Sequence, residues 1–171
     1  MKTLILMRHA KSAWDDPHQK DIDRPLAPRG RKAAPRMGAW LAEEGHLPDL
    51  VLCSTARRAQ ETLELVKPSL PKGVEVRLER ELYMAAPREL LTEIGKAADQ
   101  AKSLMLVGHN PGLGNLASSL AAAGEPRLLA QLHNKFPTGA VAVLTFETEL
   151  WREVNFGKGT LAAFLRPRDR T

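Results

Sequence analysis

The chain has 171 residues, of which 43% are hydrophobic and 26% charged, the ordinary balance of a globular protein. This length suits one domain over residues 1–171, and every apolar run falls well short of the roughly 18 residues of a membrane span. The net charge of +5 is spread out without interleaved aromatic residues. It therefore favours a solvated surface, or attraction of an anionic substrate, over nucleic-acid binding.

Short apolar runs alternate with longer amphipathic stretches, a pattern typical of α/β proteins. The first apolar run, at residues 3–7, is too short for a signal peptide, so we expect a cytoplasmic protein. Further runs predict strands, with a hairpin between the last two, at residues 49–53, 74–78, 103–107, 140–146 and 151–156. Residues 161–165 predict one more strand, at an edge of the sheet.

The stretches between these strands have helical periodicity. Helices are predicted at residues 29–44, 55–66, 87–98 and 111–122, and the polar segment 14–26 is predicted to be a loop over the end of the first strand. Together these elements predict a three-layer α/β/α sandwich with a mostly parallel central sheet.

Polar groups follow three of the predicted strands, at the point where each strand leads into a helix. Arg8-His9 follows the first strand, residues 54–59 (Ser-Thr-Ala-Arg-Arg-Ala) follow the second, and residues 108–112 (Gly-His-Asn-Pro-Gly) follow the fourth. If these strands are parallel, the three junctions meet at the sheet edge where open α/β folds bind ligands. Each group alone could be a surface pair, a solvated helix face or a cap. Their recurrence at one kind of junction, beside helix N-termini, indicates a phosphate site.

The same segments resemble the motifs of the histidine phosphatase (phosphoglycerate mutase-like) superfamily. Residues 8–14 (Arg-His-Ala-Lys-Ser-Ala-Trp) resemble its Arg-His-Gly signature, residues 54–62 its second motif and residues 108–110 its third. The resemblance spans nearly the whole chain and is greatest to the small SixA-type phosphohistidine phosphatases. Ala10 stands where the signature has glycine, and Thr55 where the second motif has proline.

The resemblance implies a phosphatase in which His9 attacks phosphorus and forms a phosphohistidine intermediate. Arg8, Arg58 and His109 would bind the phosphoryl oxygens, with His109 best as an imidazolium, and Ser12 is a further candidate ligand. A backbone carbonyl is expected to fix the tautomer of His9. Such a cationic clamp needs no metal or other cofactor.

The general acid is less clearly marked than the nucleophile. Relatives that act on phosphate esters place a glutamate after the third strand, where Glu81 is the nearest candidate, although it could equally be a solvated loop carboxylate. A labile phosphoramidate needs less acid assistance than an ester does. The short stretch from Arg58 to His109 also leaves little room for a lid. Both features favour phosphohistidine in a protein as the substrate.

Several alternatives stay open or are disfavoured. A broad phosphomonoesterase acting on small sugar or nucleotide phosphates is the second reading, and a non-catalytic phosphate-binding module is the third. A dinucleotide fingerprint at residues 112–117 is disfavoured, because other residues separate it from the preceding strand. His18, His46 and His133 lack metal-ligand spacing. Since no exposed apolar stripe is evident, a monomer is expected.

Overall fold

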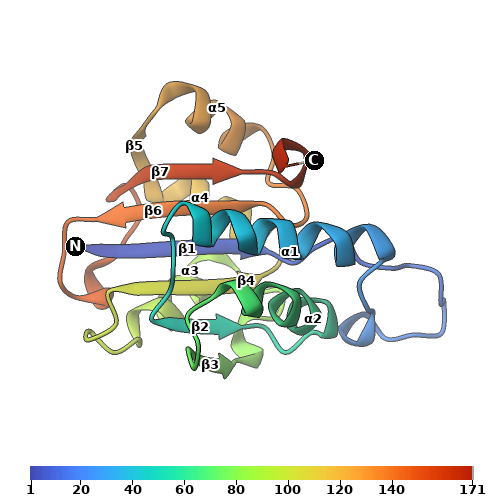
Figure 1. The fold of residues 1–171 in the computed structure, drawn as a ribbon. Coiled ribbons are helices and arrows are strands. Elements are labelled where there is room, and N and C mark those ends of the chain that lie inside the picture. The colour runs from blue at the N-terminus through green and yellow to red at the C-terminus, as the bar shows by residue number, and fades with distance from the viewer. Residues whose placement is uncertain (171) are drawn as a thin grey trace.

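The computed structural model describes residues 1–170, and its strands form one sheet (Figure 1). The strands are β1 (Lys2–Arg8), β2 (Leu50–Cys53), β3 (Glu75–Leu78), β4 (Ser103–Gly108), β5 (Ala121–Gly124), β6 (Val141–Phe146) and β7 (Gly159–Leu165). Within the described residues they lie in the order β3-β2-β4-β1-β6-β7-β5. β1 is parallel to β4, β4 to β2 and β2 to β3, whereas β6 is antiparallel to both of its neighbours. The predicted mostly parallel sheet is therefore confirmed.

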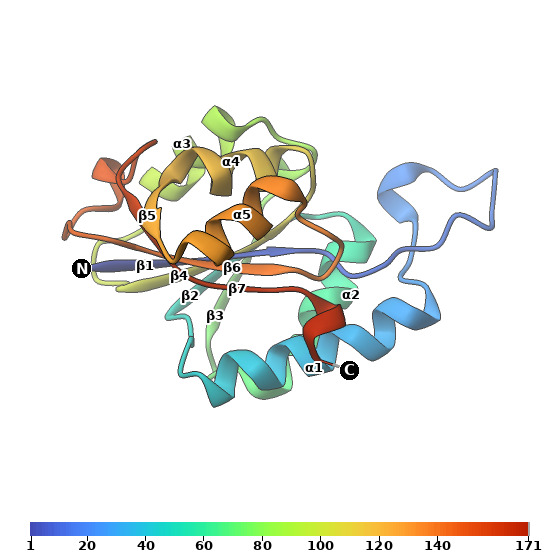
Figure 2. The same cartoon turned by 90° about the horizontal axis from the view of Figure 1, so that it is seen from above.

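Helices cover both faces of this sheet (Figure 2). They are α1 (Pro28–Glu43), α2 (Arg57–Val66), α3 (Pro87–Gly95), α4 (Gly112–Leu120) and α5 (Pro126–Asn134). Side chains alternate along each strand, so Ile5 and Met7 pack in one apolar cluster with α1 and α2. Leu4 and Leu6 pack in the other cluster, with α3, α4 and α5. This arrangement is the predicted three-layer sandwich.

Residues 151–156 do not form the predicted strand. Residues Trp151–Glu153 form a short 3-10 turn instead. The Trp151 side chain is fully buried, and its Nε1 donates to the carbonyl oxygen of Ala101 at 2.7 Å. The alternating apolar residues at 151–156 therefore belong to a turn whose Trp151 side chain packs in the core. The strand that pairs with β6 on the side away from β1 is β7 and not residues 151–156, and it pairs Leu165 with Val141.

The chain between α4 and β6 also differs from expectation. The helix predicted at 111–122 ends at Leu120, and the chain then continues as β5 and α5, neither of which was predicted. β5 pairs with β7 in parallel, so residues 161–165 lie inside the sheet and not at its edge. The Ala-rich sequence of β5 lacks the bulky side chains that mark a strand.

The parallel arrangement of β1, β2 and β4 determines where the polar junctions lie. All three strands end at the same side of the sheet, and the segment 14–26 projects beyond that side (Figure 1). As predicted, this segment is largely irregular, with one short 3-10 turn at Asp21–Asp23. None of the described helices is long and apolar enough to cross a membrane.

Candidate active site

The polar junctions surround a cavity of about 230 Å³ at the carboxyl ends of β1, β2 and β4. Five of the six predicted site residues line it, namely Arg8, His9, Ser12, Arg58 and His109. They come from the end of β1, the start of α2 and the end of β4. The structure thus brings together groups that are as much as about 100 residues apart in the sequence.

The His9 imidazole is oriented by its own chain. Its Nδ1 lies 2.7 Å from the carbonyl oxygen of Ala10, and a carbonyl oxygen can only accept, so Nδ1 carries the hydrogen. This bond leaves the Nε2 lone pair as the basic position of the ring. Burial, together with the charges of Arg58 and Arg8, lowers the pKa of His9 to about 4, although the Ala10 bond opposes the shift. His9 is therefore a neutral imidazole at pH 7.

His109 lies beside His9, with ring centroids 5.3 Å apart. Its Nε2 is 2.7 Å from the Ser54 hydroxyl oxygen, so Ser54 fixes the orientation of the ring. Burial first, then His9 and Arg58, lower the pKa of His109 to about 3. The ring is consequently neutral in the unliganded protein, so donating as an imidazolium to a bound phosphoryl group would require it to gain a proton there.

The two arginines are held mainly by backbone and loop groups. Arg8 Nη1 donates to the carbonyl oxygen of Phe136 at 3.1 Å. Arg58 is buried and donates to Asp21 twice, to the carbonyl oxygen at 2.7 Å and to carboxylate Oδ2 at 3.0 Å. Within residues 1–170, the buried side-chain nitrogens without a partner are Nε of Arg8, Nε of Arg58 and Nδ1 of His109. All three nitrogens belong to residues that line the cavity.

Thr62, on α2, connects the segment that follows β1 to Arg58. The Ala10 amide donates to Thr62 Oγ1 at 2.9 Å, and the Thr62 hydroxyl donates to the Arg58 carbonyl oxygen at 2.7 Å. Because Ala10 also accepts from His9, one chain of hydrogen bonds positions His9 and Arg58 relative to each other. The hydroxyl group of Thr62 therefore has a positioning role in addition to the packing of its methyl group in the core.

Asp21 lines the cavity and Tyr83 contacts it, and sequence reasoning named neither as a site residue. The Tyr83 hydroxyl donates to the same Asp21 oxygen that pairs with Arg58. The Tyr83 ring also packs edge-on against His109, with centroids 5.4 Å apart. The Tyr83 bond, together with Arg24 and Arg58, lowers the pKa of Asp21 to about 2 against a smaller opposing effect of burial. Asp21 is therefore a carboxylate inside an otherwise cationic site.

Arg24 stabilises the segment that carries Asp21. Its Nη1 donates to the Ser12 hydroxyl at 2.8 Å and to the Ala13 carbonyl at 3.0 Å. The Trp14 ring stacks on the guanidinium, 3.4 Å from its central carbon, although Trp14 itself is 73% exposed. Ser12 thus lines the cavity as predicted, but its oxygen already accepts a bond from Arg24.

Glu81, the predicted general acid, lies elsewhere. It is exposed and lines a separate cavity of about 250 Å³ with Glu79 and Glu93. The physical reason is the 3-10 turn Arg80–Leu82, which buries Leu82 in the core and leaves the next residue, Tyr83, in contact with Asp21 of the His9 cavity. The assignment of Glu81 is corrected accordingly.

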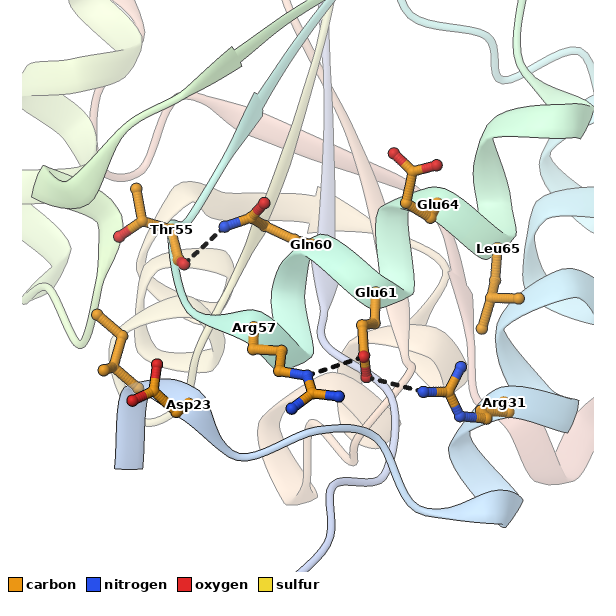
Figure 3. Close-up of a pocket in the computed structure, with 9 residues that line it drawn as sticks. Asp23, Arg31, Thr55, Arg57, Gln60, Glu61, Glu64 and Leu65 are labelled. Carbon is orange, nitrogen blue, oxygen red and sulfur yellow. Dashed lines mark hydrogen bonds and ion pairs between the residues drawn. The ribbon is translucent and has the colours of Figure 1, made fainter. Parts of the chain in front are cut away.

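A larger cavity of about 420 Å³ lies on the outer side of α2 (Figure 3). Glu61 sits at its edge, where its carboxylate contacts Arg57 at 3.0 Å and Arg31 at 3.2 Å. Its Oε1 also accepts from the Leu26 amide at 2.8 Å. These bonds occupy the carboxylate and join α1, α2 and the end of the segment 14–26. The cavity therefore belongs to the scaffold of the site, and neither imidazole lines it.

Comparison with known proteins assigns the class. The histidine phosphatase superfamily (branch 1) matches residues 4–83. An uncharacterised protein of Mycobacterium tuberculosis is 41% identical over 164 residues, which cover 95% of this chain and 100% of that protein. The chain belongs to the histidine phosphatase superfamily, and its fold and site define a phosphatase of that type.

Two solved structures narrow the resemblance within the superfamily. A candidate phosphohistidine phosphatase SixA from Agrobacterium tumefaciens has a TM-score of 0.82 at 31% identity, covering 97% of this chain and 98% of that one. A candidate SixA from Nakamurella multipartitia has a TM-score of 0.82 at 32% identity, covering 97% and 96%. Both cover nearly the full length, so the whole fold is shared and not only the motif segments.

Proposed function

We propose that this chain hydrolyses phosphohistidine in proteins through a phosphohistidine intermediate on His9. The observation that carries the proposal is the state of His9: its Nδ1 is bound to the Ala10 carbonyl, its pKa is about 4, and it lines the same cavity as Arg8 and Arg58. A neutral imidazole with a free Nε2 is a nucleophile at pH 7, and guanidinium groups are suited to phosphoryl oxygens.

In the first step Nε2 of His9 attacks phosphorus in line with the leaving nitrogen. A new P–N bond forms to His9 as the P–N bond of the substrate breaks. If the substrate imidazole is protonated at its other ring nitrogen, it leaves as a neutral ring and takes the electron pair of the broken bond. Arg8 and Arg58 neutralise the charge on the phosphoryl oxygens, and the His109 Nδ1, which has no partner in the cavity wall, is a further donor candidate.

In the second step water attacks the phosphorus on His9. The water oxygen forms the new P–O bond, and the P–Nε2 bond breaks to return neutral His9. One proton of the water stays on inorganic phosphate and the other passes to solvent. The Ala10 carbonyl holds the Nδ1 hydrogen throughout, so the ring keeps the same tautomer for the next cycle.

The acid–base groups of the cavity support a phosphoramidate substrate. Among the described residues that line it, Asp21 is the one carboxyl group, and its pKa of about 2 makes it a poor proton donor. An alkoxide leaving group needs a proton from the enzyme as it departs. A phosphohistidine ring that is already protonated at its other nitrogen leaves as neutral imidazole and needs no proton from the enzyme. The removal of Glu81 from the site strengthens this reasoning, because no other carboxylic acid takes its place in the cavity.

The test compares kcat/KM for a protein phosphorylated on histidine with kcat/KM for a panel of sugar and nucleotide phosphates. We expect the phosphohistidine protein to be preferred by at least about a hundredfold, which corresponds to about 2.7 kcal/mol at the transition state. An ester preferred by that margin would overturn the substrate assignment. Phosphate binding without turnover of any substrate would support a binding module instead.

A further inference from the structure

A basic groove adjoins the catalytic cavity. This hollow of about 390 Å³ shares the lining residues Lys11 and Thr138 with the catalytic cavity, so the two adjoin at these residues. Six of its ten lining residues are cations and none is acidic. The cations are Lys11, Arg29, Lys32, Arg36, Arg166 and Arg168. We call this hollow the basic groove.

Two elements that are far apart in the sequence form its walls. Arg29, Lys32 and Arg36 follow helical spacing along one face of α1, and Arg166 and Arg168 follow the end of β7. Figure 2 shows the last described turn, Pro167–Arg170, close to α1. The rise of about 1.5 Å per residue gives the α1 row a length of about 10 Å, which matches about three residues of an extended chain.

The floor of the groove is attached to the catalytic strand. The Gly139 amide donates to the carbonyl oxygens of Arg8 and His9, at 3.1 and 2.9 Å. Gly139 has a φ of +79°, and a Cβ there would lie 2.8 Å from Pro167 Cγ, so only glycine lets the loop pack this closely. The loop that contributes Pro137 and Thr138 to the groove is therefore tied to the strand end that carries His9.

Most of this positive charge has no acidic partner in the protein. Arg166 pairs with Asp169 at 2.9 Å. For the other five cations of the groove, no ion pair occurs within residues 1–170. Clustered like charges repel one another, which makes an acidic ligand at this surface favourable.

We propose that the basic groove binds an acidic segment of the phosphoprotein substrate and so presents its phosphorylated side chain to His9. This inference rests on the proposed function. The cavity that contains His9 takes the phosphoryl group, and the groove beyond Lys11 and Thr138 takes the chain to which that group is attached. The apolar lining residues are Ala33, Pro137 and Pro167, and none of the lining residues is aromatic. Without rings on which bases stack, an acidic peptide is favoured over single-stranded RNA.

The test replaces Arg29, Lys32 and Arg36 by glutamate and leaves every residue of the catalytic cavity in place. The matched control replaces Lys67, Lys72 and Lys158 by glutamate, because these lysines are exposed and line neither hollow. The substrates are two phosphohistidine peptides, one flanked by Glu and Asp and one by Gln and Asn, together with p-nitrophenyl phosphate.

We expect the wild type to prefer the acidic peptide by at least about tenfold in kcat/KM at low salt, through KM. The groove variant should lose this preference and keep its activity on p-nitrophenyl phosphate within about threefold. The control variant should behave as wild type on all three substrates. Equal activity of the wild type on both peptides, or the same loss in the control, would overturn the proposal.

A binding measurement tests the groove proposal separately from the proposed phosphatase function. Fluorescence anisotropy follows an unphosphorylated acidic peptide and an RNA oligonucleotide of equal charge. If the wild type does not hydrolyse phosphohistidine, the proposed function fails, but the groove is still supported when the acidic peptide binds the wild type and binds the groove variant at least about tenfold more weakly. Absence of peptide binding, or tighter binding of the RNA, contradicts the groove proposal.

Discussion

At the scale of single residues, the catalytic cavity keeps two imidazoles neutral beside two guanidinium groups. Burial does most of this, and the positive neighbours add to it. Under the proposed function, the neutral ring makes His9 a nucleophile at pH 7. The free energy of unfolding should also depend on pH, because both histidines bind protons more readily in the unfolded chain than in the native protein.

The first prediction concerns this dependence. Since the pKa values of His9 and His109 fall from 6.5 to about 4 and about 3, the unfolded state binds more protons below pH 6.5. The stability that the neutral rings contribute is therefore complete above pH 6.5 and is lost as the pH falls toward 4. Urea unfolding of the wild type should show a lower free energy at pH 5 than at pH 7.

The matched variants are His9→Gln and His133→Gln. The first removes a buried histidine and should reduce the loss of stability between pH 7 and pH 5, whereas the second alters an exposed one and should leave the loss unchanged. An identical pH dependence in the wild type and His9→Gln would contradict a depressed pKa for His9.

Asp21 is the second residue with a measurable consequence. Its carboxylate occupies an Arg58 nitrogen that would otherwise be available to an anion. Asp21→Asn keeps an acceptor for Tyr83 and removes a negative charge beside the anion site, so we expect inorganic phosphate to inhibit about threefold more strongly, which is about 0.6 kcal/mol.

The control for this prediction is Asp16→Asn, which removes the same charge from the same segment. Asp16 accepts from the His18 amide and does not contact Arg58. Its inhibition constant should stay at the wild-type value. Weaker phosphate binding in Asp21→Asn would show that the carboxylate holds Arg58 in position for the anion and does not compete with it.

The sequence predicts those site residues that stand next to a strand, and it does not predict those that meet only through a contact distant in the sequence. Arg8, His9, Arg58 and His109 adjoin apolar runs, so strand ends locate them. Tyr83 and Asp21 are 62 residues apart and meet through a hydrogen bond between a turn and a loop, which no local pattern marks. The acidic composition of residues 14–26 indicated a solvated loop, although one of its carboxylates lines the cavity.

At the scale of elements, α1 is seated on the segment that follows the nucleophile. The Ala27 amide donates to the Lys11 carbonyl oxygen at 2.9 Å. Gly30, in the first turn of α1, faces the same backbone, and a Cβ there would overlap the Lys11 oxygen. This contact sets the distance between α1 and the catalytic segment.

Replacing Gly30 tests that packing. Gly30→Ala should lower the free energy of unfolding by about 1–3 kcal/mol, because the added Cβ would overlap backbone atoms of Lys11 and not the end of a flexible side chain. Gly95→Ala is the control: a Cβ there meets only Arg152 Cα at 3.6 Å, an ordinary contact, so alanine should be neutral or stabilising. Equal effects of the two substitutions in urea unfolding would contradict the close seating of α1.

The burial of apolar residues also explains which strands were predicted correctly from the sequence. The four strands β1 to β4 are apolar or amphipathic runs bounded by breakers, and their positions match the sequence pattern closely. The pattern at 151–156 is misleading because Trp151 is buried from a turn, where its indole and backbone nitrogens bind Ala101 and Asp99. Periodicity records which residues are buried and does not show whether a strand or a turn buries them.

At the scale of the whole molecule, the sheet places chemistry and binding at one end. Apolar clusters on its two faces fix the strands, and the parallel run β2-β4-β1 aligns three junctions that carry His9, Arg58 and His109. The antiparallel β6 then enters through the loop at 137–139, which hydrogen-bonds to the catalytic strand. The proposed nucleophile, the proposed phosphate ligands and the basic groove therefore lie at one edge of the sheet.

The measurement that tests this account most directly is trapping of the phosphoenzyme during turnover, with an alkaline quench that preserves phosphohistidine and peptide mapping of the phosphoryl group. We predict the phosphoryl group on His9, and a kcat at least about a thousandfold lower in His9→Ala, with wild-type activity in the exposed variant His133→Ala. A phosphoryl group on His109 or Ser54, or a His9→Ala variant that turns over at the wild-type rate, would contradict nucleophilic catalysis by His9.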